Sequence, residues 1–389
     1  AERGTFVLEL EDGVEIGNTD CIELGHTRSE PEFSWHGERV ALDDLEAAYD
    51  GALEDIYPTR CREAPSSCRK AVEGQEEDCD LPAPSPAPEP HARVAPPVGT
   101  ARPRFLIPVF PGTNCEYESA RAVERAGGRA EVLVVNALSA EAMRASADRF
   151  AERLSASQAL LLPGGFSNGD EPDGSGKFIA IFLRSPAVRG AVEALLEARG
   201  GLICGICNGF QALVKTGLLP YGRILDPEDP IKEPKGPGDK SDGPDRLDRN
   251  APTLTFNTIG RHQSRMVRTR VLSNRSPWLR RVREGDVHTM PISHGEGRFV
   301  CEPELLRRLA KAGQVATQYV DPEGRPTMDI RYNPNGSAGA VEGLLSPDGR
   351  VFGRMGHAER VGPYLYRNVE GNYGTEMFES AVEFFTGGK

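Results

Sequence analysis

The stretch Gly201-Leu-Ile-Cys-Gly-Ile-Cys-Asn-Gly-Phe-Gln211 changes character at its centre. Its first half is apolar and rich in branched residues, which predicts a buried strand, and a helix is expected from Asn208. Cys207 would then lie on a sharp turn between strand and helix, where Gly205 and Gly209 leave room for tightly packed backbone. The positive end of the helix dipole favours a thiolate at this position. The pattern therefore predicts a cysteine nucleophile on an α/β fold.

Apolar strands and amphipathic helices alternate around this stretch. Strands are expected at residues 105–110, 130–135, 159–162 and 201–206, and helices at 116–126, 139–152 and 177–198. This alternation predicts an α/β fold with a mostly parallel sheet and helices on both faces. Further strands are expected at 253–256, 266–272, 314–320 and 351–355. Ligands of such folds bind at the carboxyl ends of the strands, so the loops there are the candidate site.

The chain divides by composition into three parts. Residues 1–60 are expected to form a small α/β piece, with strands at 5–10 and 21–24 and a helix at 42–53. Residues 61–102 are rich in proline, which predicts an extended, mobile linker. The main domain is expected at 103–389, with an exposed loop at 226–252.

Composition limits the possible functions. The chain has 389 residues, 38% hydrophobic, and contains no apolar run long enough to span a bilayer and no charged-then-apolar leader, so neither a membrane protein nor a signal peptide is expected. The net charge of −12 argues against a nucleic-acid partner. The basic cluster from Arg261 to Arg270 is compatible with a small phosphorylated ligand or with a solvated face. Eight cysteines without a regular framework favour a reducing cytoplasm.

A histidine and a carboxylate follow the expected strand at 351–355. In Gly356-His-Ala-Glu-Arg360, the side chains of His357 and Glu359 would point to the same side of a strand-like segment. A carboxylate that orients the imidazole makes it a general base for a cysteine nucleophile. We therefore predict a triad of Cys207, His357 and Glu359.

Cys204 offers a different interpretation of the same stretch. Together with Cys207 it matches the spacing of a redox pair or of half a zinc site. No second cysteine pair follows at zinc-site spacing, and Cys204 lies inside the expected strand. We therefore expect Cys204 to be a buried structural residue and no metal site in this chain.

Paired glycines follow the strand at 159–162. In Leu162-Pro-Gly-Gly-Phe-Ser167, the backbone N–H groups of Gly164 and Gly165 can turn toward an anion. With the N–H of Asn208 they are candidates for an oxyanion hole. An ordinary tight turn is the alternative.

Six motifs together resemble one known family. They are Phe110-Pro-Gly-Thr-Asn-Cys115, Pro163-Gly-Gly-Phe-Ser-Asn-Gly-Asp170, Gly205-Ile-Cys-Asn-Gly-Phe-Gln211, His294-Gly-Glu-Gly-Arg298, Asn333-Pro-Asn-Gly-Ser337 and Gly356-His-Ala-Glu-Arg360. In this order they resemble the class I glutaminase domain of phosphoribosylformylglycinamidine synthase, over roughly 104–387. Residues 1–60 resemble the end of the synthetase region in long fused forms of that enzyme. The segment from Asp170 to Lys177 and the residue Ala358 depart from the family pattern without removing a reacting group.

The resemblance implies a flavodoxin-like amidotransferase fold and a reaction. Cys207 would attack the side-chain amide of L-glutamine, His357 would transfer the proton, and ammonia would pass to the synthetase region. Gln211, His294, Gly295 and Arg298 would hold the amino-acid end of the substrate. No cofactor is implied in this chain, whereas ATP and Mg²⁺ would act in the synthetase region during purine biosynthesis.

Two other functions share parts of this pattern. A cysteine peptidase or DJ-1-like enzyme has the same elbow, but the Cys-Asn-Gly-Phe-Gln phrase and the His-x-Glu spacing favour a glutaminase. A non-catalytic docking domain would not need a complete triad. Assays with glutamine, peptides and thiol-blocking agents discriminate among the three.

Overall fold

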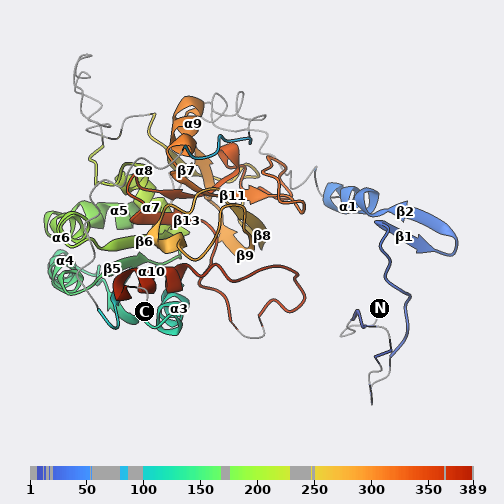
Figure 1. Ribbon diagram of the computed structural model, residues 1–389, viewed down its shortest axis with the longest axis horizontal. Coiled ribbons are helices and arrows are strands. Elements are labelled where there is room, and N and C mark those ends of the chain that lie inside the picture. The colour runs from blue at the N-terminus through green and yellow to red at the C-terminus, as the bar shows by residue number, and fades with distance from the viewer. Residues whose placement is uncertain are drawn as a thin grey trace. The chain divides into compact units, whose positions relative to one another are not determined.

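The computed structural model describes residues 7–11, 13–14, 17, 21–52, 54, 79–85, 100–167, 176–227, 247, 250–362 and 365–387. The chain separates into two units, residues 1–59 and residues 60–389, and each has its own β-structure (Figure 1). The predicted limits at 1–60, 61–102 and 103–389 remain a prediction.

A β-hairpin followed by a helix makes up the regular secondary structure described in the first unit. β1 (Glu32–Trp35) pairs antiparallel with β2 (Glu38–Ala41) across a turn in which His36 and Gly37 both have positive φ. α1 (Leu42–Gly51) confirms the predicted helix.

The strands expected at 5–10 and 21–24 are wrong where the structure describes them. Residues 7–10 and 21–24 are exposed and belong to no strand. Their apolar side chains, such as Val7 and Ile22, cover no core. A strand is stable only where it pairs with a neighbour and buries one face, and neither segment finds such a neighbour among the described residues.

The parallel half of the central sheet lies in the second unit. Its strands are β3 (Arg104–Val109), β4 (Arg129–Val134), β5 (Ala159–Leu162), β6 (Leu202–Ile206) and β13 (Val351–Arg354). They follow the order β4-β3-β5-β6-β13, and every neighbouring pair is parallel. The predicted α/β fold with parallel strands is confirmed.

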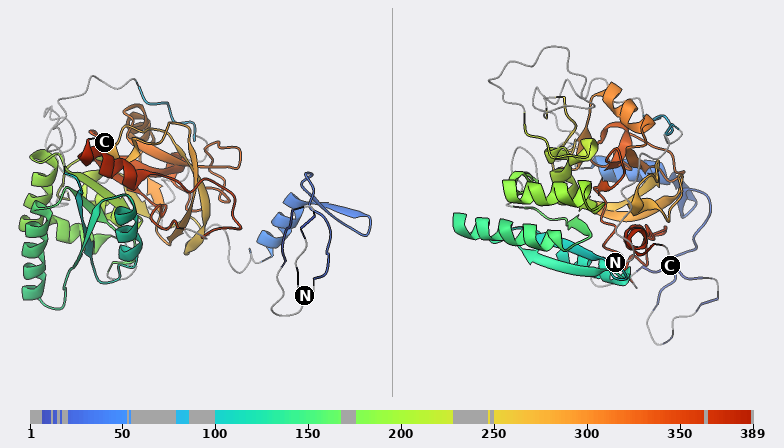
Figure 2. Two further views of the ribbon diagram at one scale, coloured as in Figure 1. Left: turned by 60° about the horizontal axis from the view of Figure 1, so that its bottom comes forward. Right: turned by 60° about the vertical axis from the view of Figure 1, so that its left-hand side comes forward.

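Helices cover both faces of this half. One face carries α3 (Glu116–Arg125) and α10 (Met377–Thr386), and the other carries α4 (Ala140–Ser155), α5 (Lys177–Arg184), α6 (Pro186–Glu197) and α7 (Asn208–Thr216) (Figure 2). The connection from β3 to β4 crosses the sheet toward one edge, whereas the connections from β4 to β5 and from β5 to β6 cross it toward the other edge. Right-handed crossovers therefore place α3 on the face opposite α4.

The single helix expected at 177–198 is two helices. α5 ends at Arg184, Ser185 is extended (φ −62°, ψ 140°), and α6 begins at Pro186. A proline disfavours helical backbone at the preceding residue but suits the first position of a helix. The prediction missed this break.

An antiparallel half continues the sheet beyond β13, giving nine strands among the described residues. The added strands are β12 (Val341–Leu345), β11 (Val315–Val320), β8 (Gln263–Val271) and β9 (Val287–His294), in the order β13-β12-β11-β8-β9. All four of these pairings are antiparallel. β8 and β11 were predicted, whereas β9 and β12 were not.

The second unit also contains smaller elements. β7 (Thr253–Thr255) and β10 (Arg298–Val300) form a separate pair, and the short helices are α8 (Leu218–Tyr221), α9 (Pro303–Lys311), η1 (Pro277–Leu279) and η2 (Ala338–Ala340). Most of the loop expected at 226–252 lies outside the described residues. In the described part of the chain, no helix combines the length and apolar character that crossing a bilayer requires.

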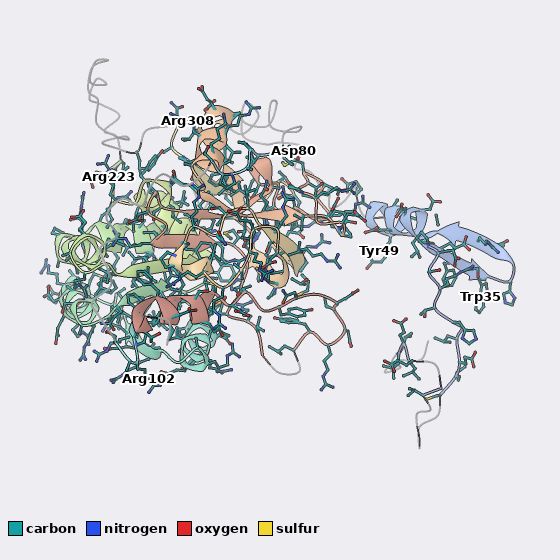
Figure 3. The ribbon with its side chains drawn as sticks, viewed as in Figure 1. Trp35, Tyr49, Asp80, Arg102, Arg223 and Arg308 are labelled. Carbon is teal, nitrogen blue, oxygen red and sulfur yellow. The ribbon has the colours of Figure 1, made fainter. Side chains whose placement is uncertain are left out.

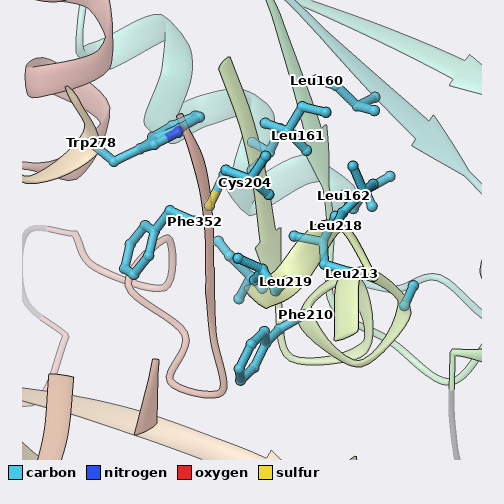
Figure 4. Close-up of a cluster of buried hydrophobic side chains, with 14 of the residues drawn as sticks. Leu160, Leu161, Leu162, Cys204, Phe210, Leu213, Leu218, Leu219, Trp278 and Phe352 are labelled. Atoms are coloured by element: carbon cyan, nitrogen blue, oxygen red, sulfur yellow. The ribbon is translucent and has the colours of Figure 1, made fainter. Parts of the chain in front are cut away.

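The main core lies against the strands of the parallel half. Cys204, Leu161 and Phe352 are fully buried there, and Trp278 closes one side of the cluster (Figure 4). Burial raises the pKa of the Cys204 thiol well above its ordinary value. This environment suits the structural cysteine expected at Cys204.

Residues 79–85, which we call the strap, lie inside the predicted linker and pack against the rest of the second unit. Leu81 contacts the main core, and the side-chain amide of Gln318 donates to the carbonyl of Cys79 (3.1 Å). The N–H of Ser85 donates to the carbonyl of Lys311 at the end of α9 (2.8 Å). Figure 3 labels Asp80 of the strap and Arg308 of α9. This segment is therefore anchored, although proline-rich sequence alone predicts mobility.

Candidate active site

Cys207 lies at the carboxyl end of β6, directly before α7. Its backbone is at φ +51° and ψ −106°, a conformation that residues with side chains rarely adopt. Its N–H donates to the carbonyl of Arg354 (2.8 Å), and its carbonyl accepts from the N–H of Gln211 (3.0 Å). The side chain is only 3% exposed, and its Sγ lies 3.7 Å from the carbonyl oxygen of Ser293. The local geometry is that of a nucleophile elbow.

Two glycines make this turn possible. A Cβ added to Gly209 would lie 2.2 Å from the carbonyl oxygen of Leu162, and one added to Gly205 would lie 2.6 Å from the carbonyl carbon of Gly209. Neither position can hold a side chain without moving backbone. The close approach expected from the sequence is present.

His357 follows β13, which runs parallel to β6, so it emerges at the same edge of the sheet as Cys207. Its Nδ1 lies 2.7 Å from Oε1 of Glu359, and both side chains are almost fully buried. The segment is a turn closed by the N–H of Arg360 on the carbonyl of His357 (3.2 Å), not the strand-like stretch expected. The turn still brings carboxylate and ring together. Among the residues that the structure describes, none makes a hydrogen bond with Nε2 of His357.

The charges around His357 favour its protonated form. Burial opposes a charged imidazole, but the Glu359 carboxylate and the Cys207 sulfur outweigh burial and raise the pKa of His357 well above its ordinary value. The site can therefore hold an imidazolium beside a sulfur nucleophile.

Gly164 forms one wall of the site. A Cβ added there would lie 2.7 Å from Cε1 of His357, 3.1 Å from Sγ of Cys115 and 3.4 Å from Cβ of Cys207. The His357 ring and both cysteines therefore lie close to the Gly164 backbone, and a side chain at this position would displace the ring.

The other two candidate oxyanion residues differ in their surroundings. Gly165 has φ +144°, and an added Cβ would lie 2.7 Å from the carbonyl oxygen of Gly112, so it packs against the neighbouring turn. Asn208 is the first residue of α7, and its Oδ1 accepts from the N–H of Ser167 (3.3 Å). Asn208 thus connects the glycine loop to the elbow.

Gln211 connects the start of α7 to the loop at residues 295–297 with its side chain. Its Oε1 accepts from Nδ2 of Asn208 (3.0 Å), and its Nε2 donates to the carbonyl of Glu296. The side chain is 3% exposed. The structure therefore gives Gln211 contacts within the protein, and its contact with substrate remains a prediction.

His294 is the last residue of β9 and is buried next to the site. Its Nδ1 lies 3.2 Å from Oδ1 of Asn257. Burial, reinforced by the neighbouring His357 and His262, lowers the pKa of His294 to about 3. His294 is therefore neutral near pH 7.

Asn257 also holds the rest of this loop. Its Nδ2 donates to the carbonyl of His294 (2.8 Å), and its N–H donates to the carbonyl of Gly295 (2.9 Å). The side chain of Arg298 is buried at the start of β10. The predicted substrate residues between 294 and 298 thus lie in one hydrogen-bonded segment, which Gln211 connects to the elbow.

Sequence reasoning missed the close neighbours of the triad. Cys115 is fully buried, with Sγ 3.9 Å from Nδ1 of His357 and 2.9 Å from Nη2 of Arg360. Both residues lie in quoted motifs, Cys115 at the end of 110–115 and Arg360 at the end of 356–360. Nothing in their local pattern shows that segments so distant in sequence meet.

One cluster in the described part of the chain has metal-binding residue types. Ligand atoms of Cys115, His357 and Glu359 lie within 4.8 Å of one another. The guanidinium of Arg360 lies against the Cys115 sulfur, and its positive charge opposes a cation at this place. The cluster fits proton transfer better than metal binding.

Comparison with known proteins assigns the chain to a family. Residues 102–385 match the CobB/CobQ-like glutamine amidotransferase domain, and the chain belongs to this family. The phosphoribosylformylglycinamidine synthase subunit PurQ of Symbiobacterium thermophilum is 32% identical, covering 73% of this chain and 97% of that protein. The subunit of the same name from Thermomicrobium roseum is 34% identical, covering 72% of this chain and 95% of that protein.

A solved structure is also similar. PurLQS from Thermotoga maritima has 25% sequence identity and a TM-score of 0.48, covering 73% of this chain and 99% of that one. The resemblance to a glutaminase domain, derived from six motifs, is confirmed by the family match and the relatives.

Proposed function

We propose that this chain hydrolyses L-glutamine to glutamate and ammonia, for the ATP-dependent conversion of formylglycinamide ribonucleotide to formylglycinamidine ribonucleotide. The observation that carries this proposal is the strained Cys207 elbow beside the His357–Glu359 pair, joined at 2.7 Å. Membership in a glutamine amidotransferase family and relatives named as synthase subunits support it. This reaction is part of de novo purine biosynthesis.

The first half of the reaction forms a thioester. The Cys207 thiolate attacks the carboxamide carbon of glutamine, and the carbonyl oxygen becomes an oxyanion beside Gly164 and Asn208. The His357 imidazolium gives its proton to the leaving nitrogen, so that ammonia departs as the C–N bond breaks. Glu359 keeps the ring oriented and stabilises its charge in the interval.

The second half releases glutamate. Neutral His357 removes a proton from water, the hydroxide attacks the thioester carbon, and the second tetrahedral intermediate collapses. The C–S bond breaks, the sulfur leaves as thiolate, and the imidazolium is restored. No oxidant, metal or cofactor takes part in this half-reaction.

The synthetase region of the same enzyme is the proposed partner. It would bind ATP and Mg²⁺ and receive the ammonia in the cytoplasm. We propose that residues 1–60 belong to that region and that 61–102 join it to the amidotransferase domain. Hydrolysis without a waiting acceptor would waste glutamine, so the site is expected to be fully assembled only with the partner.

Glutamate release tests both parts of this proposal. We expect slow hydrolysis by the chain alone, and at least a tenfold rise in kcat/KM for glutamine when the synthetase region, ribonucleotide, ATP and Mg²⁺ are added. No glutamate release in either condition, or faster cleavage of peptides than of glutamine, would contradict the function. A fast and unchanged rate would contradict only the coupling.

A further inference from the structure

Two buried charged residues lie behind the triad and take no part in the proposed chemistry. Arg354 is the last residue of β13, 1% exposed, and Glu342 lies on the neighbouring β12, fully buried. Nη2 of Arg354 lies 3.0 Å from Oε2 of Glu342, and Nε of Arg354 lies 3.2 Å from Oε1. The two therefore form a bidentate ion pair without contact to solvent.

The Glu342 carboxylate makes a further contact that points to the active site. Its Oε1 accepts from the N–H of Gly356 at 2.7 Å. Gly356 directly precedes His357, whose own N–H donates to the carbonyl of Pro291 (2.9 Å). Two successive backbone N–H groups are thus held, and one of the two acceptors is the buried carboxylate.

Gly356 has little freedom to move away. A Cβ added to it would lie 2.3 Å from Sδ of Met290 and 2.9 Å from Oε1 of Glu342. The backbone at this position is therefore enclosed between the methionine and the carboxylate. A shift of Gly356 would carry the His357 ring with it.

The ion pair is itself held in one orientation. The hydroxyl of Thr317 on β11 donates to Oε2 of Glu342, and Nη2 of Arg354 lies 3.4 Å from Oγ1 of Thr269 on β8. The network spans β8, β11, β12 and β13. Because every member is buried, its geometry is determined by packing and not by solvent.

We propose that Glu342 is a positioning residue, which holds the Gly356 N–H and through it places His357 for reaction with Cys207, while Arg354 compensates the buried carboxylate. The inference rests on the proposed glutaminase function. Removing one charge would leave the other buried and unpaired, so single variants would test stability more than position. Pairs of substitutions avoid that problem.

Two double variants differ in the polar groups at residue 342, which include the acceptor for Gly356. Glu342→Gln with Arg354→Met removes both charges but keeps an amide oxygen, and the amide nitrogen can donate to Thr317. Glu342→Leu with Arg354→Met removes both charges and the acceptor. If leucine prevents folding, Glu342→Met with Arg354→Met repeats the comparison at nearly the original volume.

The measurements are kcat and KM for glutamine and the rate of Cys207 alkylation by iodoacetamide at pH 7, read by mass spectrometry of the Cys207 peptide. We expect the glutamine variant to keep kcat within about threefold of wild type. The leucine variant should lose at least tenfold in kcat, with KM changed less than threefold, and its alkylation should slow by a similar factor. Misplacing His357 by a small distance is enough for such a loss.

The possible results distinguish a failure of the positioning role from a failure of the proposed function. Equal kcat in the two double variants, whether near wild type or reduced, would overturn the role of Glu342 as acceptor. A loss confined to KM would overturn it as well. If the wild-type chain released no glutamate, the proposed function would fail, and the difference in alkylation rate would still decide whether Glu342 positions His357.

Discussion

The two halves of the central sheet place their functional residues by different physical means. In the parallel half, β5 and β6 are continuous apolar strands, and Cys207 emerges where β6 ends. In the antiparallel half, β11 is equally buried but carries Thr317 and Gln318 in its interior. Topology positions the proposed reacting groups in the first half, whereas buried hydrogen bonds position the supporting loops in the second.

Each mechanism has its own weakness. An apolar strand tolerates changes of similar volume, but the strained turn at its end requires glycine on both sides, as at Gly205 and Gly209. A buried polar group such as Gln318, which donates to the carbonyl of Gly339 (2.8 Å), costs free energy whenever its partner is lost. Substitutions should therefore affect chemistry in the parallel half and mainly stability in the antiparallel half. Glu342 on β12 is the expected exception, because its carboxylate holds the N–H of Gly356 next to His357.

The largest expected effect tests the parallel half. Cys207→Ser should reduce glutamine hydrolysis at least about a thousandfold, because a hydroxyl is a much weaker nucleophile here, with Tm nearly unchanged. Cys204→Ser, three residues earlier in the core, should keep most of the activity. Glutamate release and thermal unfolding measure both variants. Activity of Cys207→Ser within a few-fold of wild type would refute the assignment, and equal losses would favour a redox pair.

A smaller effect, on stability, is expected from β9 in the antiparallel half. Burial lowers the pKa of His288 to about 4 and that of His294 to about 3. Between the ordinary pKa of about 6.5 and these values, the unfolded chain binds more protons than the folded one, so stability falls as pH falls. From pH 7 to 5 the loss should be about 2 kcal/mol for each histidine.

His357 offsets only a small part of this loss. Its pKa is raised, so its contribution is fully present below about pH 6.5 and decreases as pH rises from there to the folded value. Urea unfolding at pH 7 and pH 5 measures the difference, and His294→Gln should reduce it by about half. A free energy of unfolding that stays constant over this range would show that these histidines are accessible to protons in the folded state.

The sequence predicted the parallel half better than the antiparallel half. Its strands read as short apolar runs separated by helices, and Cys207 and His357 follow such runs directly. β9 (Val287–His294) contains His288, Pro291 and His294, and these residues interrupt the apolar pattern that predicts a strand. Cys115 could not be placed either, because its approach to His357 depends on how distant strands are ordered in the sheet.

The strap gives the smallest and most local expected effect. Leu81 is partly buried against the core, and a Cβ on Gly339 would lie 3.3 Å from its Cδ1. Leu81→Ala should lower the free energy of unfolding by about 1 kcal/mol, less than a fully buried leucine would lose. Asp80→Ala is the matched control, since Asp80 is exposed in the same segment and should change stability by less than about 0.5 kcal/mol.

Urea unfolding of the full chain compares these two variants, with glutamate release measured in parallel. The strap contacts η2, α9 and β11, so its loss should reduce stability without changing kcat. Equal stabilities for Leu81→Ala and Asp80→Ala would mean that the strap adds nothing to the fold and serves only as linker. A fall in kcat with Leu81→Ala would mean instead that the antiparallel half transmits strain to the site, and the separation of chemistry from stability drawn between the two halves would fail.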